Sequence, residues 1–124
     1  MHIEQLLEYC SGKAGVTEGF PFDKDTLVLK VMGKMWAVTS LSDEPFRVNL
    51  KCDPEWAIEL RDEHEEIKPG WHMNKKHWNT VIIGAGTLEL SLIHKLIDHS
   101  YELVVKGLTK AKKAELASIA EKGG

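Results

Sequence analysis

Two runs of strand-forming residues, separated only by Gly33 and Lys34, constrain this chain more than any other feature of its sequence. The runs cover residues 26–32 and 35–41 and are rich in valine, threonine and large apolar residues. A two-residue connection that contains glycine is typical of a tight β-hairpin, because glycine adopts the backbone angles that such a turn requires. The sequence therefore predicts a pair of antiparallel strands.

The side chains of this hairpin divide into two faces, because successive residues of a strand point to opposite sides of a sheet. A turn at Gly33-Lys34 places Val31 opposite Trp36 and Leu29 opposite Val38. We assign one face to the core, and this face carries Leu27, Leu29, Val31, Trp36 and Val38. The opposite face is expected to carry Val28, Lys30, Met32, Met35, Ala37 and Thr39.

The remaining elements follow from periodicity and capping residues. Phe46, Val48 and Leu50 alternate with polar neighbours, which predicts a third strand with one buried face. Shorter strands are indicated at residues 16–20 and 78–83, with 67–77 resembling a loop. Helices are predicted for residues 2–11, 53–64 (begun by Asp53-Pro54), 87–107 (capped by Thr87) and a last segment capped by Thr109.

This order of elements predicts the fold class. It is α+β, a two-layer sandwich in which helices cover one face of an antiparallel sheet, in the order α-β-β-β-α-β-β-α-α. A chain of 124 residues has the length of one domain. We therefore expect residues 1–124 to form a single domain.

Charge and cysteine content exclude several classes of protein. Lys and Arg number 16 against 19 Asp and Glu, a net charge of −3, which argues against purely electrostatic nucleic-acid binding but allows a local basic patch. No apolar run approaches the roughly 18 residues of a membrane helix, and the N-terminus does not resemble a secretory signal. We therefore expect a cytoplasmic protein without membrane contact, in which Cys10 and Cys52 are free thiols.

Sequence motifs of catalysis are missing. The chain contains no glycine-rich phosphate loop, no Gly-x-Ser-x-Gly elbow and no His-Glu-x-x-His pair. Cys52 precedes a predicted helix N-terminus, which can activate a thiol, but no base accompanies it and an inert buried thiol is favoured. We expect a protein that is not an enzyme and that needs no cofactor and no metal.

Several stretches of the chain resemble the MmcQ/YjbR family of small bacterial proteins. They follow the family's order over residues 1 to about 108 and comprise Pro21-Phe22, 30–35, 50–54, Leu60-Arg61, 69–81 and 97–104. The resemblance implies a fold similar to CyaY/frataxin-like and secretion-chaperone-like sandwiches, and a double-wing DNA-binding function. The last helix, residues 109–122, lies outside the resemblance.

Residues 71–79 are the candidate binding segment, because lysines alternate there with aromatic rings and hydrogen-bonding side chains. Cations neutralise phosphates and rings stack on bases, so this mixture suits nucleic acid. The candidate residues in the segment are Trp71, His72, Asn74, Lys75, Lys76, His77 and Asn79. Its tryptophans can equally belong to the core, and its Asn and His side chains can satisfy the backbone of the loop.

A second basic strip is predicted on the polar side of the sheet. It consists of Lys30, Arg47 and Lys51, with Lys34 at the tip of the hairpin. Charges at these positions also serve simply to keep a sheet surface soluble. Double-stranded DNA is the main expected partner, bound through the loop and this strip by a protein that we expect to be monomeric.

Two alternatives remain open. A second protein is the alternative partner, suggested by the expected exposure of Val28, Met32 and Met35. A small ligand or metal at His72 and His77 is the other, although five residues separate the two and would place them on opposite sides of a regular strand.

Overall fold

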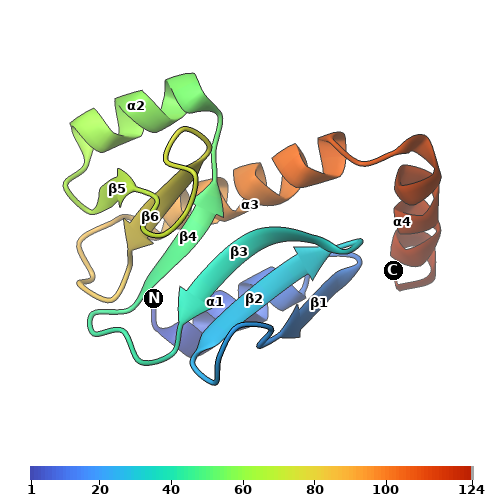
Figure 1. Ribbon diagram of the computed structural model, residues 1–124, viewed down its shortest axis with the longest axis horizontal. Coiled ribbons are helices and arrows are strands. Elements are labelled where there is room, and N and C mark those ends of the chain that lie inside the picture. Colours follow the sequence, from blue (N-terminus) through green and yellow to red (C-terminus); the bar gives the residue numbers. More distant parts are fainter. Residues whose placement is uncertain (124) are drawn as a thin grey trace.

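In the computed structural model, which describes residues 1–123, helices pack against one face of a six-stranded antiparallel sheet (Figure 1). This arrangement confirms the predicted α+β class. The helices are α1 (Ile3–Ser11), α2 (Pro54–Glu63), α3 (Leu90–Lys106) and α4 (Lys110–Gly123). The strands are β1 (Val16–Gly19), β2 (Thr26–Val31), β3 (Lys34–Ser40), β4 (Arg47–Lys51), β5 (Ile67–Pro69) and β6 (Trp78–Ile82).

The strands lie side by side in the order β1-β2-β3-β4-β6-β5. The first four form a meander, while β6 inserts between β4 and β5 and pairs Asn49 with Thr80. The strand indicated at residues 16–20 is present as β1 and forms one edge of the sheet, so four strands precede α2 instead of the three in the predicted order. Residues 67–69, expected to be a loop, form the other edge, because Ile67 is buried opposite Val81.

The register of the β2–β3 hairpin differs from the prediction. Its turn is Met32-Gly33, with φ of 50° and 84°, and it pairs Val31 with Lys34. A bulge follows, so that Leu29 pairs with Ala37 and Trp36 is the extra residue. Ala37 therefore lies in the core beside Trp36, and the expected core position of Val38 is wrong: Val38 points to the opposite face together with Val28 and Asn49.

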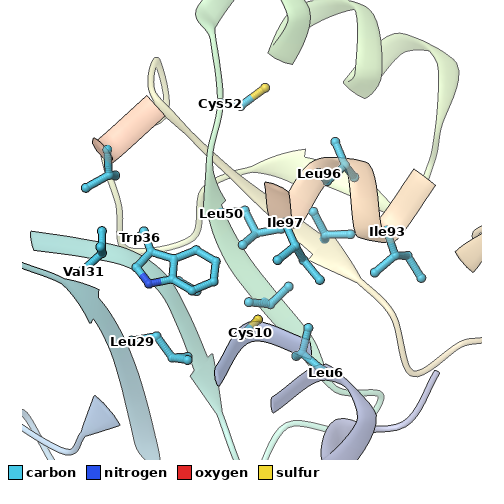
Figure 2. Packing of buried hydrophobic residues seen from close by; sticks show 14 of the residues in the cluster. Leu6, Cys10, Leu29, Val31, Trp36, Leu50, Cys52, Ile93, Leu96 and Ile97 are labelled. Carbon is cyan, nitrogen blue, oxygen red and sulfur yellow. The ribbon is translucent and has the colours of Figure 1, made fainter. Parts of the chain in front are cut away.

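The core lies between the sheet and the helices. Figure 2 shows Leu6 and Cys10 of α1 and Ile93, Leu96 and Ile97 of α3 directed toward the strands, around Leu29, Trp36 and Leu50. These side chains are at most 3 % exposed, so each aliphatic one contributes about 1.5–3 kcal/mol of burial. Cys10 and Cys52 are free and buried as expected, and burial raises the pKa of each thiol to about 12.

The helix ends show why these segments fold locally. The Asp53 carboxylate accepts a hydrogen bond from the Glu55 amide at 2.9 Å and Pro54 opens α2, as predicted. Thr109 caps α4 by accepting from the Lys112 amide. The predicted cap at Thr87 is wrong, because that hydroxyl donates to Glu66 and α3 begins three residues later.

No helix within residues 1–123 covers the other face of the sheet. In Figure 1 this face is turned to the viewer, with α1 and α3 behind the strands. The pairings place Val28, Val38, Asn49 and Thr80 on this face, which we call the open face. Among residues 1–123, no helix combines the length and the apolar character needed to cross a membrane.

Candidate functional site

A concave groove of about 660 Å³ lies on the open face, and we call it the open-face groove. Strands β2, β3, β4 and β6 form its floor, and the loops that precede β2, follow β3 and precede β6 form its walls. Its lining is mainly apolar. The lining residues are Phe22, Thr26, Met35, Val38, Ser40, Asp43, Arg47, Asn49, Trp71, His72, Met73, Asn74 and Thr80.

One wall of the groove is the loop of residues 70–77, which folds back over the open face. Gly70 permits this close approach, because a Cβ there would lie 2.7 Å from the Trp78 Cβ. The Trp71 amide donates to Thr80 Oγ1 at 2.9 Å, and Asn49 Nδ2 donates to the Trp71 carbonyl at 3.2 Å. Thr80 Oγ1 in turn donates to Asn49 Oδ1 at 2.5 Å, so the sheet holds the backbone of Trp71 in place.

The indole of Trp71 lies in the wall of the groove and contacts two other side chains that line it. It remains 52 % exposed, with the guanidinium carbon of Arg47 4.7 Å from its ring centroid and the His72 ring stacked at 5.0 Å. Arg47 Nε also donates to Asp43 Oδ2 at 3.2 Å. A half-buried cation is thus fixed against an aromatic ring, a favourable electrostatic contact. His72 adopts a φ of 60°, an uncommon conformation for a residue other than glycine.

Arg61 of α2 anchors the far end of the same loop. Its Nε donates to Asn79 Oδ1 at 2.7 Å, and its Nη2 donates to the carbonyls of Lys75 and Trp78. Hydrogen bonds from a charged donor contribute about 1.5–3 kcal/mol each. Arg61 therefore positions the loop from the helix-covered side of the sheet.

The predicted cations do not all meet at the groove. Arg47 is in it, and Lys51 is on the same face of β4, opposite Trp78. Lys75 and Lys76 are exposed on the groove's loop, and Lys75 Nζ donates to the Gly70 carbonyl at 3.3 Å. Lys30 lines a separate depression beside Phe20, and Lys34 begins β3 at the exposed end of the hairpin.

The remaining candidates of the 71–79 segment divide between the groove and the scaffold. Asn74 lines the groove, but its Oδ1 accepts from the Lys76 amide and so shapes the loop. His77 is half-buried, and its carbonyl accepts from the Cys52 amide. Asn79 is only 2 % exposed and is bound to Arg61 on the helix-covered face, which places it outside the groove.

Sequence reasoning missed several groove residues. Phe22 is 68 % exposed in the groove, and Asp43 pairs with Arg47. The four-residue spacing of Asp43 and Arg47 was a usable signal for that pair. Lys68 pairs with Thr80 across β5 and β6, so a further exposed cation lies on the open face.

The structure also gives observations on the two alternative functions, a metal or small-ligand site at His72 and His77 and a surface that binds another protein. The described chain, residues 1–123, brings no three His, Cys, Asp or Glu side chains together as a metal site would require. The expected exposure of Val28 is wrong, since the residue is 1 % exposed, and Met32 packs against the core. Met35 does line the open-face groove.

Comparison with known sequences gives matches that all point to one protein family. A sequence profile of the YjbR family matches residues 11–103. The uncharacterized protein YjbR of Escherichia coli K12 is 34 % identical over 119 residues, covering 96 % of this chain and 100 % of the relative. The uncharacterized protein YyaQ of Bacillus subtilis is 41 % identical over 114 residues, covering 81 % of this chain and 95 % of the relative.

Solved structures agree with this result. A crystal structure of a Deinococcus radiodurans protein with a DUF419 domain superposes with a TM-score of 0.87 at 43 % identity, over 94 % of this chain and 88 % of the other. A Pseudomonas syringae protein superposes with a TM-score of 0.72 at 29 % identity, over 83 % of this chain and 98 % of the other.

Proposed function

This chain belongs to the YjbR family, and we propose that it binds DNA through the open-face groove without catalysing a reaction. The observation that supports the proposal most is the exposed indole of Trp71 with the guanidinium of Arg47 fixed against it. Rings and cations in one concave surface suit a polymer of bases and phosphates.

Lysines around the groove supply the electrostatic part of this binding. Lys51 and Lys68 lie on the open face, and Lys75 and Lys76 lie on the loop that forms the groove wall. Each phosphate that a lysine neutralises releases a counterion, so the affinity depends on salt. A local cationic surface therefore gives DNA affinity to a chain whose net charge is −3.

The test is a salt titration of labelled DNA, presented as a duplex and as a single strand, against the wild type and Lys75→Ala/Lys76→Ala. Each lost phosphate contact lowers the magnitude of the log–log salt slope by about 0.7 to 0.9. We therefore expect the double variant to bind more weakly and with a shallower slope.

The matched control is Lys110→Ala/Lys113→Ala, which removes two exposed lysines from α4 instead. It should bind like the wild type. Equal loss in both variants would indicate nonspecific attraction and would contradict the assigned surface. Failure of both forms of DNA to bind at low salt would refute the proposed function.

A second candidate function is contact with another protein. Phe22 in the open-face groove and Leu41 directly after β3 are 68 % and 45 % exposed, and exposed large apolar side chains can contribute to an interaction site. We expect light scattering to show a monomer. We also expect the protein to enrich apolar peptides from a random peptide library, and the Phe22→Ser variant to lose this enrichment. Absence of any enriched peptide would contradict this candidate.

A further inference from the structure

We propose that the open-face groove accepts an unpaired base, so that the chain binds single-stranded DNA more tightly than a duplex of equal length. This inference rests on the proposed function and specifies the form of DNA that the same groove takes.

The rings that reach solvent in the groove provide the first argument. Trp71 and Phe22 both line the groove, with 52 % and 68 % of their surfaces exposed. An exposed aromatic ring can stack on the flat face of a base, and such stacking tolerates every base because each has a π face. Phe22 is the more open of the two rings, since the Trp71 ring already contacts Arg47 and His72. In a duplex those faces are covered by neighbouring base pairs, and only the edges can be reached.

The shape of the groove provides the second argument. Its volume of about 660 Å³ falls within the range of about 300–1,000 Å³ typical of small-ligand sites. It is concave, whereas reading a duplex requires an element that protrudes into a DNA groove. A nucleotide that has left the base stack fits a hollow of this kind.

The polar side chains on the floor of the groove, Asn49 and Thr80, indicate whether the edge or the face of a base would be recognised. Asn49 uses its amide on the Trp71 carbonyl and accepts at Oδ1 from Thr80, while Thr80 Oγ1 also accepts from the Trp71 amide. Each of these groups already has a partner within the protein, so we expect stacking on the base face to contribute more than recognition of the base edge. We therefore expect little preference among the four bases.

Arg47 completes the site. Its Nε is held by Asp43, and its guanidinium lies over Trp71 with 31 % of the side chain exposed. The group can then approach a phosphate beside the stacked base without losing its position. Stacking and phosphate contact are thereby combined over one or two nucleotides.

The experiment compares three probes by fluorescence anisotropy: a labelled strand of about ten thymidine nucleotides, an abasic strand of the same length, and the corresponding duplex. The abasic strand carries the same phosphates but no rings. We expect the thymidine strand to bind about 5- to 150-fold more tightly than the abasic strand, the range that one stacked base gives. The duplex should also bind more weakly.

Two exposed phenylalanines provide matched variants whose folding is not at risk. Phe22→Ala removes a groove ring and should bring the thymidine strand toward the affinity of the abasic strand. Phe20→Ala removes a ring that is 47 % exposed in the separate depression and should change nothing. Trp71→Ala should reduce binding more than Trp71→Phe, which keeps a ring in the wall.

The outcomes separate the two proposals. Binding of all three probes with equal affinity, unaffected by Phe22→Ala, would overturn the unpaired-base inference and leave DNA binding standing. Tighter binding of the duplex would do the same. Absence of binding to any probe at low salt would refute DNA binding itself.

Discussion

Ser100 shows how one hydroxyl can hold two layers together. It lies on α3, is completely buried, and donates to the Trp36 carbonyl at 2.6 Å. The same oxygen accepts from the Lys51 amide at 2.8 Å. Both backbone groups belong to strands, at the places where the bulge of β3 and the end of β4 leave them without a ladder partner.

Ser100→Ala is expected to lower the free energy of unfolding by about 1–3 kcal/mol, because it leaves a buried amide and a buried carbonyl unsatisfied. Urea denaturation followed by circular dichroism measures this loss. Ser91→Ala, on the exposed side of α3, should change the stability little. Equal effects of the two substitutions would show that the bridge has no special role.

His99 makes the stability sensitive to pH. Burial lowers the pKa of His99 below its ordinary value of 6.5, although Asp53 and Glu102 act in the opposite direction and Lys95 acts with burial. Its Nε2 accepts a hydrogen bond from the Asp53 amide at 3.1 Å, which requires the neutral ring. The contribution of His99 to the free energy of unfolding is therefore fully present above its ordinary pKa of 6.5. It is lost as the pH falls through the lowered pKa that His99 has in the folded protein.

We expect the unfolding free energy to decrease as the pH falls below about 6.5, the ordinary pKa of histidine, and to decrease less in His99→Gln. Glutamine has an uncharged acceptor that can replace Nε2 and does not titrate. Denaturation curves at several pH values measure the difference. An identical pH dependence in the two proteins would show that His99 does not cause it.

Several residue-scale features could be predicted because they are local. Asp53-Pro54 and Thr109 begin helices through contacts with amides only a few positions away. Thr87 was misassigned because its hydroxyl finds a distant acceptor, Glu66, which no local pattern contains. The face that Asn79 takes also depends on distant residues, since its pairing with Leu50 places it on the covered side of the sheet, where Arg61 binds it.

At the scale of elements, the β2–β3 hairpin shows what a one-residue difference does. The turn lies at Met32-Gly33 instead of Gly33-Lys34, and the bulge at Trp36 then changes the register again. Val38 thereby leaves the core and lines the groove. The composition predicted that the two strands exist, but it did not predict the bulge, which places both Trp36 and Ala37 in the core.

Gly33→Ala is expected to destabilise the protein by about 1 kcal/mol, because Gly33 has a φ of 84° that alanine adopts only with strain. A Cβ there meets no atom within 4 Å, so the effect is purely one of the backbone. Gly19→Ala is the control, since a Cβ at Gly19 also meets nothing and its φ is ordinary. Thermal melts should show a lower midpoint for Gly33→Ala only.

At the scale of the whole molecule, the candidate site is assembled from segments far apart in the chain. Phe22, Arg47 and Trp71 meet only because the meander and β6 form one sheet. The 71–79 segment was identifiable from its unusual composition. Phe22 was not, because an isolated aromatic residue before a strand gives no sign of which face it will join.

The position of β6 has a consequence for synthesis on the ribosome. Strands β2 to β4 can pair as they emerge, but one side of β4 has no hydrogen-bonding partner until residue 82 has been made. The apolar stripe of α3 arrives later still, so a nascent chain ending near β4 exposes both an unpaired edge and an uncovered apolar surface. We therefore expect such a nascent chain to be prone to aggregation, the condition in which chaperones protect unfinished chains.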